Sequence, residues 1–474
     1  MNAEERVQNM GTAKLLPLIL VMSVPAVCGN IVNALYNIVD RIFVGRIVGG
    51  TALGAVGVMF PLNNIIAAFT VLMSIGGGAL VSLSLGRQEK EKADKAFTNI
   101  ILFSLFVAVV ISSVFFFFAE PLIEICGADE SSALYEMAVK YLRIIAVGQL
   151  FGIPNLAMAA CIRAEGNTRY AMIVTMAGAG INVCMDAIFM MGFHWGVEGA
   201  AAATVISQIV SCGLSLQYHC CHKGVLRWKG LAVLDVGLIG KVISLGLAPA
   251  VFQGLSFCNN TLVNHSLMRY ANMEIGRGGG DMAISAVSVI HTVENFAAMF
   301  IMGMNSAIST IISYNYGLKQ YGRAKEATLT GQAIATVVST VLWTLMMAVP
   351  ETLFRIFSTD VPELIAYGAR AMRMGKLFIF GLGFQTLSSM YYSAIGKPKR
   401  AIFISISRNG LFLIPALLLL SGILGLDGVL ISTSVSDALS LIVVSVIYWS
   451  GIHDLNKLEQ KDSKGAEKEA GCLF

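Results

Sequence analysis

The sequence is a succession of long apolar stretches separated by short polar segments. About 20 helical residues cross the ~30 Å hydrocarbon core of a bilayer, and the stretches are of this length or longer. Only 13% of the 474 residues are charged, whereas a soluble domain carries about 25%, so lipid has to solvate much of the surface. We therefore expect an all-α integral membrane protein with about twelve spanning helices. The stretches lie near 15–40, 52–84, 96–118, 134–161, 170–193, 196–218, 237–265, 282–312, 326–349, 362–394, 400–421 and 425–450.

The composition gives little support for other classes of protein. A net charge of +4 does not favour a nucleic-acid partner. We find no phosphate-binding loop of the GxxxxGK(S/T) kind and no nucleophile–base set, so we expect neither direct use of ATP nor an enzyme. The cluster at 219–222 (HCCH) lies in a short basic loop without a second pair of ligands, so we expect no metal there.

Basic residues indicate which loops lie in the cytoplasm. They gather in alternate loops, at 87–95, 223–229, 319–325 and 397–400, and in the C-terminal tail. The loops between them carry few basic residues. This bias predicts a multi-pass protein of the inner (plasma) membrane with both termini in the cytoplasm.

The two halves of the chain resemble each other. The run 86–96 matches 317–327 at an offset of 231 residues, and Thr204 matches Thr433 at 229. Six spans separate equivalent points, and because six is even, both halves have the same topology. We therefore expect two parallel six-helix lobes related by a pseudo-two-fold axis along the membrane normal. The N-terminal lobe is expected at 1–219, a cytoplasmic linker at 220–241, and the C-terminal lobe with its tail at 242–474.

Ionisable side chains inside a span are costly unless they face a cavity or a partner. Asp40, Asp186 and Glu294 are the clearest examples. Asn182 lies one helical turn before Asp186, and a hairpin of the fifth and sixth spans puts Thr204 at the same depth. Oxygen atoms at one level suit a proton or a small cation. The alternative is that Asn182, Asp186 and Thr204 simply bond one another or a neighbouring helix.

Other polar residues and one proline complete the set of candidates. Pro25 removes a backbone hydrogen bond from the first span and is expected to kink it, which makes it a candidate hinge. Glu294 either contacts a cationic cargo or is a buried acid bonded to His291, and the sequence leaves both possibilities open. A polar stripe in the first two spans is expected to face a substrate cavity. It consists of Asn33, Tyr36, Asn37 and Asn64.

The repeat shows that the two lobes differ in their acids. The counterpart of Asp40, at an offset of 224, is Asn264, and that of Asp186 falls at Pro415 or Ala416. Purely structural pairing would be expected in both lobes. The loss of both acids from the second lobe therefore favours a dedicated ion site in the first.

From residue 12 to 450 the sequence resembles the multidrug and toxic compound extrusion (MATE) family, in particular its bacterial branch. The matching segments are specific in their order and spacing rather than one by one. They are 36–46 (YNIVDRIFVGR), 163–169 (RAEGNTR), 182–186 (NVCMD), 197–200 (VEGA) followed by Thr204, and 313–317 (SYNYG). The resemblance implies twelve spans in two six-helix lobes, no cofactor beyond the coupling ion, and export of drugs and organic cations in exchange for Na⁺ or H⁺.

The resemblance also implies a coupling site. Family members with a cation site in the first lobe use an Asp of the first helix, an Asn, an Asp four residues later and a Thr eighteen further on. In this sequence these positions are Asp40, Asn182, Asp186 and Thr204, with no metal implied beyond a possible Na⁺ there. Other members carry an essential acid in the seventh helix, where this chain has only Asn259, Asn260 and Asn264. A coupling site in the second lobe is therefore in doubt.

We thus expect a monomeric secondary exporter of small organic cations that works in the lipid bilayer by alternating access. The alternative on the same fold is a flippase for lipid-linked precursors. A flippase would be expected to line its cavity with basic residues, whereas the basic residues here lie almost wholly in cytoplasmic loops. A receptor or a channel fits the parallel repeat and the acids of a single lobe poorly.

Overall fold

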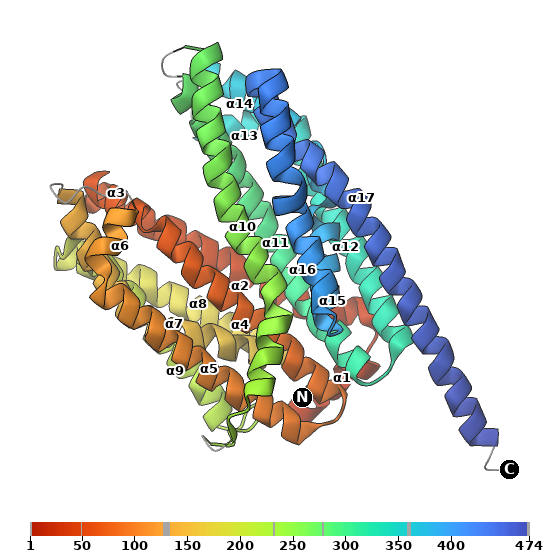
Figure 1. Cartoon of the computed structure of the whole chain (residues 1–474). Coiled ribbons are helices and arrows are strands. Elements are labelled where there is room, and N and C mark those ends of the chain that lie inside the picture. Colours follow the sequence, from red (N-terminus) through yellow and green to blue (C-terminus); the bar gives the residue numbers. More distant parts are fainter. Residues whose placement is uncertain are drawn as a thin grey trace. The chain divides into compact units, whose positions relative to one another are not determined.

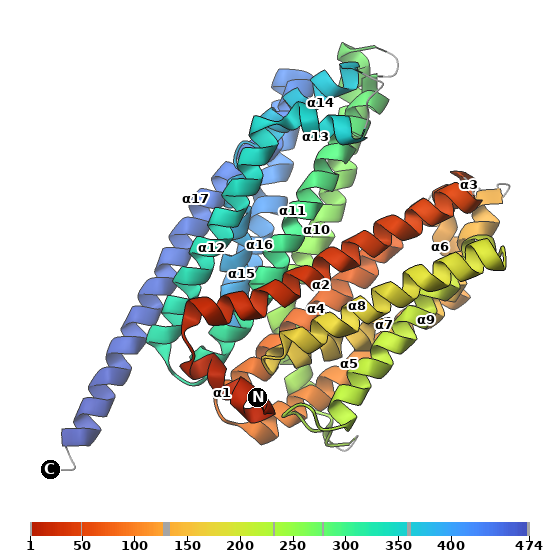
Figure 2. The same cartoon turned by 180° about the vertical axis from the view of Figure 1, so that it is seen from behind.

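The computed structural model describes residues 2–48, 50–126, 133–230, 233–276, 279–357 and 362–471. All regular structure within these ranges is helical (Figures 1 and 2), which confirms the prediction of an all-α protein. The chain divides into two compact units, one up to Ala250 and one from Val251 onward. The assignment of 220–241 to a linker between lobes stays a prediction.

Long helices packed side by side form the first unit. They are α1 (Ala3–Thr12), α2 (Leu15–Phe43) with the π-helical turn η1 (Val44–Val48), α3 (Gly50–Val58), α4 (Phe60–Gly86), α5 (Lys90–Phe117), α6 (Ala119–Ile125), α7 (Ala133–Ala164), α8 (Thr168–Asp186) with the π-helical turn η2 (Ala187–Gly192), α9 (Gly196–Cys220) and the start of α10 (Val236–Glu274). Helix α7 has the most extensive packing, against α9, α5 and α4, while α2 packs along α8.

Two glycines let α4 and the start of α10 approach closely. A Cβ atom at Gly76 would overlap the carbonyl oxygen of Val242, and one at Gly246 would overlap that of Leu72. The two backbones therefore touch where the helices cross. Small residues allow such close crossings in membrane bundles, where packing rather than water drives helix association.

The second unit contains the remaining helices. They are the rest of α10, α11 (Gly279–Gly317), α12 (Tyr321–Ala348), α13 (Pro350–Phe357), α14 (Pro362–Gly375), the short 3₁₀ helix η4 (Ile379–Gly381), α15 (Leu382–Ala394), α16 (Pro398–Ile406), the π-helical turn η5 (Ser407–Phe412) and α17 (Leu413–Gly471). Helix α17 is interrupted at Gly425, whose φ of 57° and ψ of −129° are not helical. Glu274 Oε1 accepts a hydrogen bond from the Leu426 amide there, at 2.8 Å.

The helices account for the twelve predicted spans. Within the described residues, ten helical stretches are long and apolar enough to cross a membrane, and the last of them runs from Pro398 to Lys461. This last stretch holds two predicted spans, which meet at Gly425. The predicted span 362–394 is broken into α14, η4 and α15, and the predicted span 52–84 is divided into α3 and α4 at Met59.

Side chains from neighbouring helices compensate the break in the tenth span. Ser434 Oγ donates to the Met374 carbonyl at 2.6 Å and accepts from the Leu377 amide at 3.2 Å. Ser339 Oγ donates to the Phe380 carbonyl at 2.6 Å. Non-helical backbone is tolerated at membrane depth only when its polar groups find partners in the protein or in water.

The segment 223–230, which we call the strap, is held by buried acids of the first unit. Glu165, 1% exposed, accepts hydrogen bonds from the Leu226 amide at 2.7 Å and the Tyr218 hydroxyl at 2.9 Å. Asp94, 2% exposed, accepts one from the Arg227 amide at 2.8 Å. The strap is therefore fixed to the ends of α5 and α7 rather than free.

Helix α1 covers the start of the strap. Arg6 Nη2 donates to the Lys223 carbonyl at 2.9 Å. Met10 is fully buried, and its side chain lies near Gly166, where φ is +79°. The N-terminal helix and the strap thus pack on the same end of the first unit.

Candidate functional site

Two buried carboxylates of the first unit lie next to each other. Asp40, near the end of α2, is 9% exposed, and Asp186, the last residue of α8, is 0% exposed. Their side chains are within hydrogen-bonding reach of each other, and Tyr36 lies close to both. The packing of α2 along α8 brings these distant parts of the sequence together.

Helices α8 and α9 add two more oxygen-bearing side chains. Asn182 Nδ2 donates a hydrogen bond to Thr204 Oγ1 at 3.3 Å. Asn182 Oδ1 and both carboxylate oxygens of Asp186 are buried and receive no hydrogen bond from a donor in the described part of the chain. The π-helical turn η2 begins directly after Asp186, and such turns are frequent at functional sites. The four predicted coupling residues therefore form two side-chain pairs, Asp40 with Asp186 and Asn182 with Thr204, and Asn182 and Asp186 lie one helical turn apart on α8.

The chemistry of these side chains calls for a positive partner. Two ionised carboxylates at close range in a low-dielectric site repel each other strongly. Burying them is tolerable only when a proton or a cation offsets their charge. Carboxylate, amide and hydroxyl oxygens are hard ligands of the kind that bind hard metal cations. The buried oxygens of Asp186 and Asn182 without donors fit either a proton or Na⁺.

The predicted polar stripe lies partly on an exposed face of α2. Asn33 and Asn37 are exposed there, and Asn37 Nδ2 donates to the Asn33 carbonyl at 2.6 Å. Asn64 is half-buried on α4. Polar side chains exposed inside a span are expected to face a water-filled cavity or a partner rather than lipid. The substrate cavity beside α2 stays a prediction. Helix α2 runs through Pro25 as one helix. The role of Pro25 as a hinge stays a prediction.

Glu294, on α11 of the second unit, is at the centre of a group of charged side chains. Its Oε2 is ion-paired with Lys376 Nζ and lies 3.4 Å from His291 Nδ1, and its Oε1 lies 3.5 Å from Arg408 Nη2. The side chains of Glu294 and Lys376 are 14% and 8% exposed. Lys376 is in the break of the tenth span, between α14 and η4. The negative charge of Glu294 is thus already neutralised within the protein.

Arg408 extends this group to α17. Its Nε donates to Asp437 Oδ1 at 2.6 Å, while Asp437 Oδ2 is buried and has no hydrogen-bond partner among the described residues. Arg408 lies in the π-helical turn η5 of the eleventh span. We refer to Glu294, Lys376, Arg408 and Asp437 as the lobe-two network.

Sequence reasoning missed the two cations of this network. The expectation that basic residues lie almost wholly in loops is wrong for Lys376 and Arg408, which are buried inside spans. The signal was available, since both positions interrupt apolar stretches.

Comparisons with known proteins agree with this architecture. The MatE family model matches residues 25–188 and 258–418. The multidrug export protein MepA of Staphylococcus haemolyticus is 24% identical over 431 residues, which are 90% of this chain and 92% of that protein. An outward-facing structure of a multidrug resistance MATE family transporter of the MOP superfamily aligns with a TM-score of 0.83 at 22% identity, covering 93% and 96% of the two chains.

A second solved structure shows the same fold. It is a MOP superfamily transporter from Pyrococcus furiosus, described as having a binding pocket of reverse polarity, and it aligns with a TM-score of 0.85 at 21% identity over 94% and 98% of the two chains. These likenesses confirm the predicted fold of twelve spanning helices in two parallel six-helix lobes. The family model matches more than half of the chain. This protein therefore belongs to the MATE family of multi-pass transporters, which act on small molecules in the plasma membrane.

Proposed function

We propose that the protein is a secondary active exporter that moves drugs and other small organic cations out of the cell in exchange for Na⁺ or H⁺. Membership of the MATE family and the likeness to a multidrug export protein support drug export. The single observation that carries the exchange is the buried pair of Asp40 and Asp186. Such a pair is stabilised when a proton or cation arrives, and this is what a coupling site requires.

The transport cycle we propose is alternating access by two lobes. A cation entering from outside binds at Asp40, Asn182, Asp186 and Thr204, biases α2 about Pro25, and lowers the affinity for cargo. The coupling is a difference in binding free energy between two states, so it has to be reciprocal. The outward-facing structure of a related transporter supports a cycle in which the cavity opens to the outside.

The cargo side of the proposal rests on exposed polar faces inside the spans. In the first lobe Asn33 and Asn37 are exposed and Tyr36 and Asn64 are half-buried, and in the second lobe the Glu294 side chain on α11 is 14% exposed. A cationic cargo would have to compete with Lys376 for this carboxylate. We further propose a monomer with both termini in the cytoplasm, supported by the distribution of Lys and Arg between loops.

Efflux of a fluorescent organic cation tests the coupling site. Proteoliposomes loaded with ethidium are given an inward Na⁺ gradient or an inward H⁺ gradient, and the loss of ethidium is followed. The gradient that drives efflux identifies the coupling ion. Asp40→Asn and Asp186→Asn should each lower gradient-driven efflux about tenfold or more, because the amide cannot carry the charge that the ion neutralises.

Asp427→Asn is the matched control. It removes the same charge from an exposed residue that forms a surface ion pair with Arg370, and it should leave efflux within about twofold of the wild type. Full gradient-driven efflux by both Asp40→Asn and Asp186→Asn would contradict the proposed site. Efflux that responds to neither gradient would contradict the exchange.

The flippase alternative is not proposed. The relatives named above are described by multidrug export or resistance or by a transporter fold, and none of these descriptions supports transport of lipid-linked precursors. The two buried cations of the lobe-two network are each paired with an acid. They do not form the unpaired basic lining that a phosphate-bearing cargo would need.

A further inference from the structure

A cavity lies between α16 and α17 in the second unit. Its volume is about 390 Å³, and its walls combine basic and apolar side chains. Phe403 and Val446, which line it, are 46% and 68% exposed. In a membrane protein, exposed apolar side chains of this size on spanning helices contact lipid, so the cavity opens toward the bilayer. The lining residues are Lys399, Arg400, Phe403, Val446, Ile447 and Ser450.

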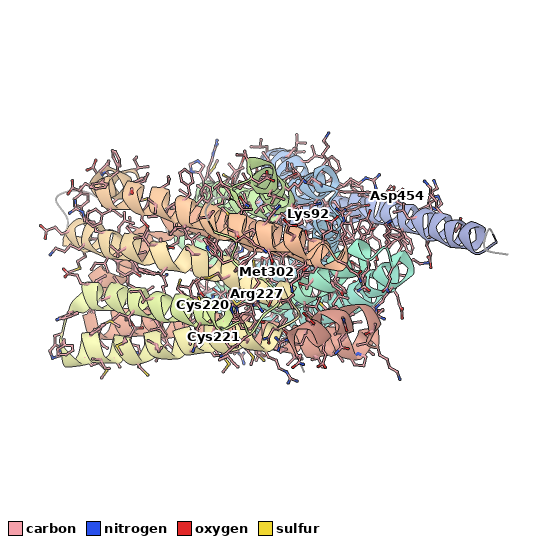
Figure 3. All side chains as sticks on the ribbon, turned by 90° about the horizontal axis from the view of Figure 1, so that it is seen from below. Lys92, Cys220, Cys221, Arg227, Met302 and Asp454 are labelled. Carbon is pink, nitrogen blue, oxygen red and sulfur yellow. The ribbon has the colours of Figure 1, made fainter. Side chains whose placement is uncertain are left out.

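The mouth of this cavity carries a surplus of positive charge. Lys397 Nζ and Arg400 Nη1 share one acid, Asp454 Oδ2, at 2.9 Å and 3.0 Å. Asp454 lies in the C-terminal part of α17 (Figure 3). Lys399 forms no ion pair with the described residues of the chain. Three cations therefore face a single carboxylate.

Two further features suit a phosphate group. Helix α16 begins at Pro398, and no side chain caps its first turn, so the amide groups there lack helical partners and favour an anion. Arg400 is held in place by Asp454 and by the ring of Tyr392, whose centre lies 5.5 Å from the guanidinium carbon. A guanidinium fixed in advance loses little conformational entropy when a ligand binds.

The depth of the cavity fits the edge of the bilayer. Trp449, next to the lining residue Ser450, is 62% exposed, and tryptophan is enriched at the boundary between hydrocarbon and headgroups. The basic residues stand at one end of the cavity, on the first turn of α16, and the apolar wall continues along the helices from there. This arrangement of a basic end followed by an apolar wall matches the polar headgroup and the apolar tail of a phospholipid.

We propose that this cavity binds an anionic phospholipid, with its headgroup phosphate at Lys399, Arg400 and Ser450 and an acyl chain along Phe403, Val446 and Ile447. Basic pockets between spanning helices at the cytoplasmic face bind anionic headgroups in this way. The inference is independent of the coupling ion and of the cargo. Under the proposed orientation the lipid belongs to the cytoplasmic leaflet.

Native mass spectrometry of the full-length protein in detergent tests the proposal. The protein is titrated with dioleoyl phosphatidylglycerol, with dioleoyl phosphatidylcholine, and with inorganic phosphate as a competitor. Phosphatidylglycerol should bind more tightly than phosphatidylcholine. Lys399→Gln should weaken the binding of phosphatidylglycerol about fivefold, the effect of one basic residue near a membrane surface.

Two more variants locate the site. Lys461→Gln removes the same charge from an exposed position further along α17 that does not line the cavity, and it should leave binding unchanged. Val446→Trp fills the apolar wall from an exposed position and should weaken the binding of both lipids. Equal losses in Lys399→Gln and Lys461→Gln would overturn the site, and equal affinity for the two lipids would overturn the role of the headgroup. Displacement of the lipid by millimolar inorganic phosphate would show that the ligand is free phosphate.

Discussion

At the scale of single residues, the surroundings of each buried acid decide what it can do. Asp40 and Asp186 are buried beside each other, so their charges call for a proton or a cation. Glu294 is also mostly buried, but Lys376 already neutralises its charge. Glu165 is buried beneath the strap, outside the spans, and burial raises its pKa to about 7 even though hydrogen bonds from the strap oppose this shift. These three environments lead to different predictions.

The raised pKa of Glu165 predicts that docking of the strap depends on pH. The docked form holds its proton up to about pH 7, whereas a released strap would leave Glu165 near its ordinary value of 4.5. Between these values the docked form binds more protons than the released form, so docking weakens as the pH rises and is weakest above about 7. Arg6, Tyr218 and the strap amides all lower the pKa of Glu165, but burial outweighs them.

Hydrogen exchange at the Leu226 amide measures this effect. Relative to Glu165→Gln, the protection factor of the wild type should fall roughly twentyfold between pH 5.5 and 7.5. The amide variant keeps an acceptor for Leu226 and does not ionise, so the ratio removes the intrinsic effect of pH on exchange. An unchanged ratio would mean that Glu165 has the same pKa in both forms.

At the scale of elements, the break in the tenth span places Lys376 where a continuous helix would not. Removing one partner of a buried ion pair leaves an uncompensated charge and typically costs about 3–5 kcal/mol. Lys376→Met should therefore lower the free energy of unfolding by about this amount, with some relief because Arg408 also lies near Glu294. The double variant Glu294→Gln/Lys376→Met should recover most of the loss, since no charge is then left unpaired.

Thermal or denaturant unfolding of these variants in detergent completes a double-mutant cycle. Thr340→Ala, on the neighbouring helix α12, controls for a general effect of substitution within a span. Destabilisation by the double variant equal to the sum of the effects of Lys376→Met alone and Glu294→Gln alone would show that Lys376 and Glu294 do not interact energetically. A recovery that occurs only with Arg408 also replaced would assign the coupling to that residue instead.

These elements also show which features of the structure can be predicted from the sequence. Long apolar stretches are sufficient to predict the spans, because the bilayer imposes their length. The spacing of Asn182, Asp186 and Thr204 in a hairpin predicts their common depth, because helical rise is fixed. The break near Lys376 was not predictable, because its backbone groups are satisfied by Ser339 and other side chains distant in sequence. Only the tertiary structure supplies those partners.

At the scale of the whole molecule, each lobe has its own buried charges at positions that are not equivalent. The first lobe has Asp40 and Asp186. Its residues at the positions equivalent to the lobe-two network are uncharged at every offset from 229 to 231. For example, Asn63 is the counterpart of Glu294, and Gln208 is the counterpart of Asp437. The second lobe carries the charged residues of the lobe-two network and has no acid at the counterparts of Asp40 and Asp186. One lobe is therefore suited to respond to an ion and the other to stay electrically neutral within itself.

If an ion in the first lobe and the cargo bias the same two states, their binding has to be linked in both directions. Saturating coupling ion, Na⁺ or H⁺ as the efflux assay identifies it, should weaken ethidium binding by the same factor by which saturating ethidium weakens the ion, within the range of about 5–150-fold typical of such coupling. Calorimetric titration of the purified protein measures both factors. Asp186→Asn should reduce the effect of the ion on ethidium binding to a factor of about one while ethidium still binds, because only the ion site is altered. A factor of about one in the wild type would show that the two ligands do not bias the same pair of states.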